Sequence, residues 1–354
     1  MGRWRMELLP GARSGIISRL IGENMQPYLV DVPVMLNIWT RPNIQRQTFA
    51  AIKKARPSIL FLISDAGRNE EENRRIAESR KIVEDIDWDC QVHKLYYETN
   101  QGMYKVISEE FEFVFSKVDR CIFLEDDILA NVDFFRFCAE LLEKYKDDLR
   151  VTAINGMNPL GVYEEVEEDY FFTRANCISG YALWKRSYDL FKMDCFESAE
   201  LRRLIKNARK YTNDLLNKSI DMQYELYRSG EGYRDHPPAV EFFRSFINVT
   251  QNQLDIVPKK NMISNIGANN GTNVGNIKLL PRRVQKLFAL PTYSLSFPLK
   301  HPEYVMRDYY YENLMFQNWR KRLVDTVETV WFHLIYLSPK TNINKLINKI
   351  TRKR

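Results

Sequence analysis

Three adjacent carboxylates, Glu125, Asp126 and Asp127, directly follow a short apolar run at residues 121–124. Side chains of like charge repel one another, so a fold gains nothing by crowding them at the end of a buried strand. Oxygen ligands of this kind suit hard divalent cations such as Mg²⁺ and Mn²⁺. The triplet therefore indicates a cation site with open positions for a phosphate-bearing molecule. A solvated acidic turn, in which Asp127 helps to cap the next helix, is the alternative.

The segments around these carboxylates alternate between strand-like and helix-like patterns. Strands are expected at 32–39, 58–65, 91–98, 120–127 and 151–156, and helices at 42–55, 70–83, 104–117 and after a capping asparagine at 131. Strands separated by such helices need crossover connections, which predicts an α/β protein with a mostly parallel sheet covered on both faces. Ligands bind outside the carboxyl ends of such strands. Arg41, Asp65 and the three carboxylates all fall at that edge.

Alternation along a strand would send Glu125 and Asp127 to one side of the sheet and Asp126 to the other. Because the chain turns where the strand ends, two of the three carboxylates can nevertheless converge. Beyond residue 156 the pattern weakens, although a short strand is expected near 255. A Gly/Asn-rich loop at 265–276 is expected to be mobile, and its closure over a bound ligand is a hypothesis.

Composition and cysteine usage indicate an ordinary globular protein. The 354 residues are 45% hydrophobic and 28% charged, and they are numerous enough for one large domain or two. The five cysteines form no CxxC pair, and this favours reduced thiols over a disulfide framework or a zinc site. With no visible signal peptide and no run of about 18 apolar residues, a cytoplasmic location is expected. P-loop and GxGxxG patterns are absent, so ATP-hydrolysing and dinucleotide-binding functions have no support.

The C-terminal segment carries the basic charge of the chain. Residues 318–354 contain nine Lys/Arg and two Asp/Glu, whereas the whole chain has a net charge of +6. The apolar positions of residues 319–335 recur at helical spacing beside basic residues, which predicts a peripheral contact with an anionic membrane, on its inner face. A helix packed on the domain with a solvated basic end is the alternative. No nucleic-acid recognition motif accompanies the charge, so nucleic acid is not expected as a partner.

An ordered string of segments resembles the nucleotide-binding half of metal-dependent glycosyltransferases with the GT-A fold. These segments are VMLNIWTRPNIQRQTF, SILFLISDAG, QGMYKVISEEFEFVF, CIFLEDDILANVDFFRF and SGYALWKRSYDLF. The string is most similar to the N-acetylglucosaminyltransferases that initiate complex N-glycans and to their bacterial relatives. Later pieces, SIDMQYELYRSG, LDIVPKKNMISNIG and FPLKHPEY, resemble the bacterial members. The resemblance covers residues 32–305.

The resemblance implies a Rossmann-like GT-A sheet and a hexosyl or N-acetylhexosaminyl transfer. The donor would be a UDP-sugar with Mn²⁺ or Mg²⁺, and the acceptor a hydroxyl of a glycan or lipid-linked glycan, with inversion. It also implies a division into an N-terminal arm at 1–30, a GT-A domain at 31–305 and a helical basic tail at 306–354. Within the domain, residues 31–156 would bind the nucleotide sugar and residues 157–305 the acceptor.

The resemblance also assigns roles to the residues at the sheet edge. Asp127 would ligate the metal on the donor diphosphate, while Glu125 and Asp126 would contact the sugar and the ribose. Arg41 would contact the nucleotide, which suits an arginine near a helix N-terminus beside phosphates. Asp65 would read the uracil. The alternatives are a surface arginine and an aspartate that forms a turn.

Glycosyl transfer also needs a base for the acceptor hydroxyl, located across the sugar from the leaving group. Asp221 matches the acidic position of the family's aspartate motif, although Ile220 and Met222 stand where relatives have aromatic residues. A helical surface aspartate is the alternative, and Glu225 or Glu241 could take the role instead.

Gly180 resembles the small-residue turn beside the donor sugar in this family, although core packing alone also explains it. Two other functions stay open at this point. A sugar nucleotidyltransferase on a related sheet usually has a Gly-rich first loop, which is missing after Trp39. A non-catalytic, cation-dependent glycan-binding protein could keep the same fold.

Overall fold

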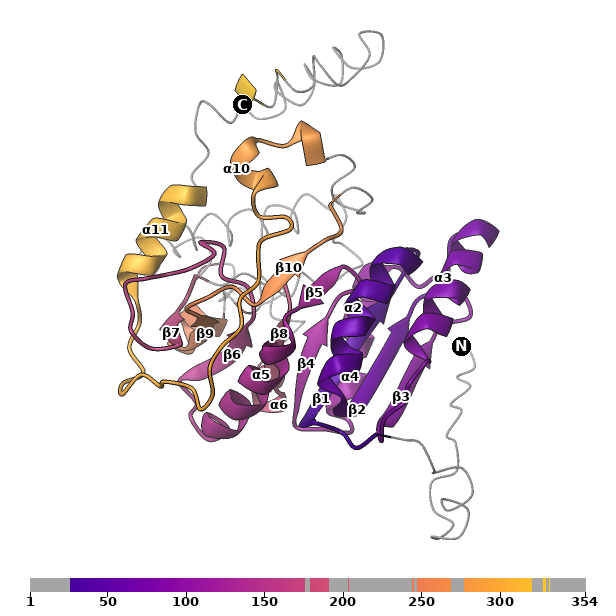
Figure 1. Cartoon of the computed structure of the whole chain (residues 1–354), viewed down its shortest axis with the longest axis horizontal. Coiled ribbons are helices and arrows are strands. Elements are labelled where there is room, and N and C mark those ends of the chain that lie inside the picture. Colours follow the sequence, from indigo (N-terminus) through magenta and orange to yellow (C-terminus); the bar gives the residue numbers. More distant parts are fainter. Residues whose placement is uncertain are drawn as a thin grey trace.

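The computed structural model describes residues 26–175, 179–190, 247–268 and 277–319, together with 203, 244, 327–328 and 331. Figure 1 shows this part of the chain as a broad twisted sheet with helices packed against it. The fold and the candidate site below are those of these residues.

A mixed sheet of eight strands forms the centre of the described part, in the order β3-β2-β1-β4-β8-β6-β9-β7 (Figure 1). The strands are β1 (Val30–Ile38), β2 (Pro57–Ser64), β3 (Gln91–Tyr96), β4 (Arg120–Leu124), β6 (Val151–Asn155), β7 (Tyr170–Thr173), β8 (Tyr181–Trp184) and β9 (Leu254–Pro258). Strands β1 to β4 pair in parallel, as do β6 and β9. Strand β8 runs antiparallel between β4 and β6, and β7 runs antiparallel to β9.

The predicted α/β class with a mostly parallel sheet is therefore confirmed, and the arrangement is consistent with a Rossmann-like GT-A fold. The sequence did not predict the two antiparallel strands, β7 and β8. Together with β9 they lie beyond residue 156, where the sequence pattern weakens, and they extend the same sheet that the earlier strands begin. The domain boundaries expected at 31, 156 and 305 stay predictions.

Four long helices connect and cover the first strands. They are α2 (Pro42–Ala55), α3 (Glu70–Val83), α4 (Met103–Phe115) and α5 (Val132–Lys144), close to the expected ranges. Helix α2 has proline in its first turn, where the missing N–H costs nothing. The side chains of Asn69 and Asn131 cap α3 and α5 by accepting hydrogen bonds from backbone N–H groups. Local sequence signals thus fix where these helices begin.

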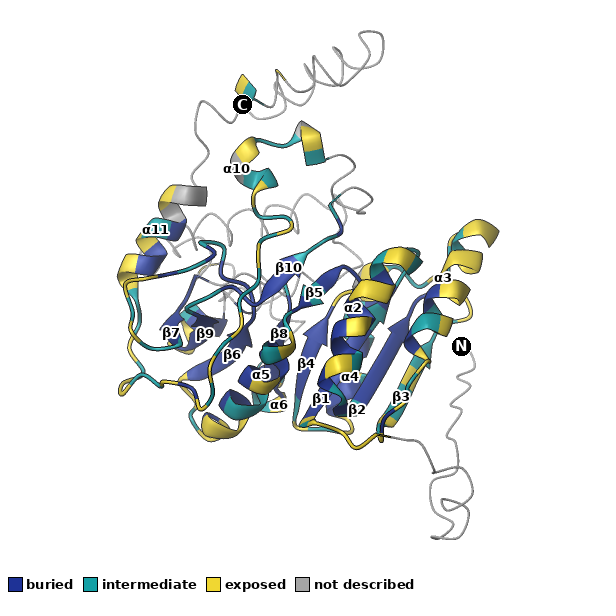
Figure 2. Ribbon diagram, viewed as in Figure 1, coloured by how far each residue is buried: buried dark blue, intermediate teal, exposed yellow. Residues whose placement is uncertain are grey.

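The helices cover both faces of the sheet. One core cluster joins Leu36, Leu62 and Leu124 to apolar residues of α2, α3 and α5. A second cluster on the opposite face joins Met35 and Phe123 of the sheet to residues of α4. Figure 2 shows β1, β2 and β4 between these layers as mostly buried, whereas the edge strand β3 has no buried residue. Alternate residues of each strand therefore belong to different cores.

Shorter elements complete the described structure. They are β5 (Ile128–Ala130), β10 (Ile263–Asn265), α6 (Lys185–Tyr188), the 3-10 turn η3 (Ile277–Leu279), α10 (Arg282–Gln285) and α11 (Tyr309–Trp319). Strands β5 and β10 pair antiparallel as a separate two-stranded ribbon beside the main sheet. None of the helices in the described ranges is long and apolar enough to cross a membrane.

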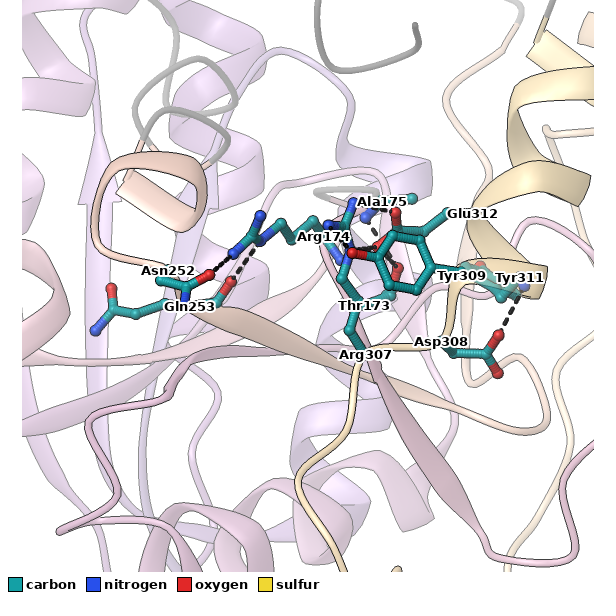
Figure 3. Close-up of polar contacts among 10 residues, drawn as sticks. All are labelled: Thr173, Arg174, Ala175, Asn252, Gln253, Arg307, Asp308, Tyr309, Tyr311 and Glu312. Atoms are coloured by element: carbon teal, nitrogen blue, oxygen red, sulfur yellow. Dashed lines mark hydrogen bonds and ion pairs between the residues drawn. The ribbon is translucent and has the colours of Figure 1, made fainter. Parts of the chain in front are cut away.

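Helix α11, the first part of the predicted tail, is fastened to the outer strand β7 by hydrogen bonds to the buried carboxylate of Glu312 (Figure 3). The carboxylate of Glu312, which is 1% exposed, accepts hydrogen bonds from Thr173 Oγ1 at 3.2 Å and from the Arg174 backbone N–H at 2.8 Å. It also pairs with Arg307, whose Nε lies 2.8 Å from Oε1 and whose Nη2 contacts Oε2. We call Thr173, Arg174, Arg307 and Glu312 the Glu312 cluster.

Candidate functional site

The carboxylate triplet lies in the turn between β4 and β5, outside the carboxyl end of β4. Strand β4 ends at Leu124, three residues before the predicted end. Glu125 is exposed, whereas Asp126 and Asp127 are 6% and 8% exposed. The turn closes with a hydrogen bond from the Ile128 N–H to the Glu125 carbonyl at 3.2 Å. Strand alternation therefore does not extend through the triplet, and the chain direction changes where the charges begin.

Asp126 and Asp127 converge on the guanidinium of Arg41, as the turn at the strand end allows. Asp126 binds it with both oxygens, at 2.8 Å from Nε and 2.5 Å from Nη2. Asp127 Oδ2 lies 3.1 Å from Nη1. Arg41 occupies the N-cap position of α2, so the carboxylates also lie near a helix N-terminus, where the helix dipole favours negative charge.

Burial shapes the ionisation of this group. Only 12% of the Arg41 side chain is exposed, and burial by itself would lower its pKa. The hydrogen bonds and charges of Asp126 and Asp127 outweigh burial and raise the pKa of Arg41 instead. Burial raises the pKa of Asp126, opposed by its contacts with Arg41 and supported by the nearby charge of Asp127. The guanidinium of Arg41 therefore keeps its positive charge. The two carboxylates, however, share this one cation.

One oxygen of this group has no partner. Asp127 Oδ1 is buried, and no group among the described residues donates a hydrogen bond to it. Two carboxylates also share a single guanidinium, which leaves a formal surplus of one negative charge. A buried acceptor without a partner costs about 1–3 kcal/mol, and a bound cation would remove that cost. The arrangement therefore fits a ligand that brings positive charge to Asp127.

The donor set fits a hard divalent cation held by few protein ligands. Among the described residues, no group of three or more His, Cys, Asp or Glu side chains could enclose a metal ion. Asp127 would be the main ligand, with Asp126 beside it, and the remaining positions would belong to water or phosphate oxygens, as Mg²⁺ sites commonly allow. Asp127 as a metal ligand stays a prediction that this geometry supports.

A backbone segment from the second half of the chain covers the ion pair. The N–H of Ile266 donates to the carbonyl of Asp127 at 3.0 Å. A Cβ atom added to Gly267 would lie 1.9 Å from Asp127 Oδ2 and 2.6 Å from Arg41 Nη1. Only glycine fits this close approach. The sequence placed this residue in the loop whose closure over a bound ligand is a hypothesis, but sequence inspection missed its position against Asp127.

Asp65 lies at the same edge of the sheet, but each oxygen of its carboxylate already accepts two hydrogen bonds. Its Oδ1 accepts the N–H groups of Ala66 at 2.8 Å and Gln101 at 2.9 Å. Its Oδ2 accepts Asn100 Nδ2 at 3.1 Å and the N–H of Gly102 at 3.0 Å. Asp65 thereby holds the loop that leads into α4. Its contact with uracil stays a prediction, but the structure adds a role in organising this loop.

Gly180 needs to be glycine for two reasons. Its φ of +68° is unfavourable for other residues, and an added Cβ would lie 2.8 Å from Ile263 and 3.0 Å from Ile128. Both isoleucines belong to the β5–β10 ribbon that follows the carboxylates. Packing accounts for the glycine, and its contact with a donor sugar stays a prediction.

The candidate base, Asp221, and its alternatives, Glu225 and Glu241, lie outside the described residues.

Comparisons with known proteins give distant structural similarity alone. No family model and no curated protein matches the chain. The fold is similar to UDP-glucose pyrophosphorylase complexed with UDP-glucose, with a TM-score of 0.35 and 8% identity over 67% of this chain and 94% of that one.

Two further solved structures are similar at the same level. Mouse xyloside xylosyltransferase 1 in its apo form has a TM-score of 0.33 and 14% identity, over 64% of this chain and 84% of that one. A cytidylyltransferase from Leptospira borgpetersenii serovar Hardjo-bovis has a TM-score of 0.27 and 9% identity, over 53% and 77%. At these values no reaction or substrate carries over to this chain, so its function is inferred from its own residues.

Proposed function

We propose that this chain is a metal-dependent glycosyltransferase that moves a sugar from a UDP-sugar to a hydroxyl group of a glycan or lipid-linked glycan. The observation that carries the proposal is the buried, unpartnered Asp127 Oδ1 in a group with surplus negative charge at the carboxyl edge of a parallel sheet. Such an edge is where α/β sheets bind nucleotides and other ligands. A divalent cation with a diphosphate attached would satisfy the oxygen and the charge together.

Each side chain of the group has a role in this proposal. Asp127, with Asp126 beside it, would hold Mn²⁺ or Mg²⁺, which supplies Lewis-acid stabilisation of the departing diphosphate. Arg41 adds a second positive charge near the N-terminus of α2, where phosphate oxygens are favoured. Glu125 is exposed, and in this proposal it would accept hydrogen bonds from sugar hydroxyl groups.

The proposed base for the acceptor is Asp221, and inversion of configuration follows from the same proposal. An Asp221→Asn variant is expected to lose at least about a hundredfold in transfer rate, because general-base catalysis usually contributes that much. Retention of more than about a tenth of the activity would remove Asp221 from the role and turn attention to Glu225 or Glu241.

Thermal shift and donor hydrolysis test the proposal directly. The protein is screened against UDP-sugars, UDP and other nucleotide sugars, each with MnCl₂, with MgCl₂ or with EDTA. A UDP compound is expected to raise the unfolding temperature only when the cation is present. Asp127→Asn should abolish this shift and lower donor hydrolysis by at least about a hundredfold, because the cation supplies several kcal/mol to the transition state.

Asp147→Asn is the matched control, since Asp147 is exposed and the substitution is chemically the same. It should respond to UDP-sugars as the unsubstituted protein does. No response to any UDP compound would overturn the proposal. Release of pyrophosphate would instead identify a nucleotidyltransferase, and cation-dependent glycan binding without hydrolysis would identify a binding protein.

A cytoplasmic location at the inner face of a membrane completes the proposal, since a lipid-linked acceptor would be presented there. The basic tail that supports it lies mostly outside the described residues. Flotation with anionic liposomes tests the membrane contact by comparing the full chain with a 1–317 truncation. Equal binding of both would remove the tail from this role.

A further inference from the structure

Helix α11 presents uncharged side chains to solvent on a face that the proposed mechanism does not use. These side chains are Tyr309, Tyr310, Asn313 and Gln317, and we call them the α11 surface. At about 3.6 residues per turn, the four positions fall within about 100° of the helix circumference, so they share one face. The buried residues of the helix lie on the opposite face and pack against the sheet; they are Tyr311, Glu312 and Met315.

The charged residues between 304 and 317 are paired within the protein. Arg307 and Glu312 pair with each other in the Glu312 cluster. Asp308 accepts hydrogen bonds from the Tyr163 hydroxyl at 2.9 Å and from a backbone N–H in the first turn of α11 at 2.8 Å. Every exposed side chain that the structure describes in this stretch is uncharged. Since complementary surfaces match in charge, the α11 surface suits a neutral partner.

Tyr309 is held in place by Arg307 (Figure 3). The Arg307 guanidinium lies 4.2 Å from the centre of the Tyr309 ring, and its Nη1 donates a hydrogen bond to the Tyr309 hydroxyl at 3.1 Å. Arg307 is itself fixed by Glu312, whose Oε1 accepts its Nε at 2.8 Å. A ring fixed in this way loses little conformational freedom when a partner stacks on it. Because 61% of Tyr309 stays exposed, the ring is available for such a contact.

Aromatic rings beside amide groups match the chemistry of a carbohydrate. A sugar ring has an apolar face of C–H groups, which packs on an aromatic ring, and a rim of hydroxyl groups. Tyrosine combines an apolar ring with a hydroxyl group, and the amides of Asn313 and Gln317 can both donate and accept hydrogen bonds. Anionic lipid headgroups attract Lys and Arg, and the α11 surface contains neither. A neutral glycan therefore fits this face better than an anionic membrane does.

The α11 surface lies far from the carboxylate triplet along the sheet. Helix α11 is attached to β7, the edge strand, whereas the triplet follows β4 (Figure 1). Four strand spacings separate β4 from β7, and at about 4.8 Å each they amount to about 19 Å. A single sugar cannot span that distance, but a chain of several sugars can.

We propose that the α11 surface binds a neutral glycan chain: Tyr309 and Tyr310 stack on its sugar rings, and Asn313 and Gln317 form hydrogen bonds with its hydroxyl groups. This inference rests on the proposed function, in which the chain is the far part of an acceptor longer than about 19 Å. Contact at two places on one acceptor raises its affinity, because the second contact forms at a high effective concentration. The surface thus favours an oligosaccharide acceptor over a single sugar.

Binding of neutral hexasaccharides tests this surface independently of the cation site. Maltohexaose, cellohexaose and chitohexaose are titrated against the full chain in EDTA and followed by saturation-transfer NMR. At least one should bind the unsubstituted protein. The double variant Tyr309→Ala/Tyr310→Ala should bind it at least about tenfold more weakly, because both stacking contacts are lost.

Two further variants separate ring stacking from general effects of substitution. Tyr309→Phe keeps the ring and loses only the hydroxyl, so it should bind within about threefold of the unsubstituted protein. Tyr28→Ala removes an exposed tyrosine that precedes β1 and is the matched control. Its affinity should equal that of the unsubstituted protein. Thermal unfolding of each variant checks that the fold is intact.

The outcomes distinguish this inference from its alternatives. No binding of any of the three hexasaccharides, or equal binding by the double variant and the unsubstituted protein, would overturn it. Loss of flotation with anionic liposomes in the double variant, without glycan binding, would assign the surface to a membrane. Loss of self-association in sedimentation, again without glycan binding, would assign it to a second copy of the chain.

The thermal-shift screen with UDP-sugars reports on the proposed function separately. A cation-dependent response to a UDP-sugar without hexasaccharide binding would remove this inference alone. Hexasaccharide binding through Tyr309 and Tyr310 without any response to UDP compounds would keep the glycan surface and remove the transferase function.

Discussion

Two buried arginine–carboxylate groups in this molecule differ in how completely their oxygens are used. In the first, Arg41 is shared by Asp126 and Asp127, and one oxygen of Asp127 has no partner. In the Glu312 cluster, Arg307 meets a single carboxylate that also accepts hydrogen bonds from Thr173 and Arg174. Exposure of the paired side chains is similar, 12% and 8% for Arg41 and Asp126 against 16% and 1% for Arg307 and Glu312.

The difference separates a structural ion pair from a ligand site. Burying charges is favourable only when hydrogen bonds satisfy the remaining lone pairs. The Glu312 cluster meets that condition within the protein, and its effect is to fix α11 to β7. The Arg41 group does not meet it, and its unsatisfied oxygen lies at the edge of the sheet where ligands bind. A carboxylate that the fold leaves short of partners is better evidence for a ligand than a buried charge alone.

Removal of the arginine from each group should give the largest effects. Arg41→Met and Arg307→Met each leave buried carboxylates without their cation, and each is expected to lower the free energy of unfolding by about 3–5 kcal/mol. MnCl₂ at millimolar concentration should restore much of the loss in Arg41→Met, because a divalent cation can replace the guanidinium between Asp126 and Asp127. Urea denaturation with MnCl₂ or EDTA measures both losses and the recovery.

Arg307→Met is the matched control for that recovery. Among the described residues, Arg307 pairs with Glu312 and with no other carboxylate, and Glu312 keeps the donors of Thr173 and Arg174, so added MnCl₂ should change nothing. Equal recovery of the two variants, or recovery of neither, would contradict the distinction between the groups.

Replacing one carboxylate in each group by its amide should lower the free energy of unfolding by different amounts. Glu312→Gln loses charge-assisted hydrogen bonds and is expected to cost about 1.5–3 kcal/mol. Asp127→Asn removes the surplus charge while Arg41 keeps both oxygens of Asp126, so unfolding in EDTA should be almost unchanged. Urea titrations of both variants without metal measure the difference. A loss in Asp127→Asn as large as that in Glu312→Gln would mean that Asp127 is a structural carboxylate.

Asp65 extends the comparison to a third carboxylate, and a smaller effect is expected there. In Asp65→Asn, an amide nitrogen in place of Oδ2 would face the Nδ2 of Asn100 and the N–H of Gly102 and could accept neither hydrogen bond. The free energy of unfolding should therefore fall by about 1–3 kcal/mol. Thermal unfolding measures this cost, and titration with UDP and with CDP measures any change in base preference. Unchanged stability together with lost preference for UDP would assign Asp65 to uracil recognition alone.

Local signals in the sequence predict the first half of the fold well. The ranges of α2 and α3 follow from an early proline, a capping asparagine and the spacing of apolar residues, and they match the expectation. Strands β7 and β8 were missed because their pairing is antiparallel and depends on partners far along the chain. No periodicity in a segment of four residues reveals such a partner.

The sequence predicted which residues form the candidate site better than it predicted the contacts between them. The carboxylate triplet and Arg41 were found from residue type and their place after strands, but their mutual pairing was not. The turn after Leu124 was expected to let two carboxylates converge, but residue type and spacing did not show that they converge on Arg41. Gly267 was missed for a related reason, since it matters through what it approaches in space rather than through a motif.

The ribbon formed by β5 and β10 gives the site a defined place in the order of folding. It pairs Ile128 with Asn265, 137 positions later in the chain, and Ala130 with Ile263, 133 positions later. Such distant contacts form late, because a long loop must close before they stabilise anything. Arg41 and the carboxylates are synthesised early, but the backbone that covers them arrives only with Gly267. A nascent chain would thus hold the charged residues of the site long before it could hold their geometry.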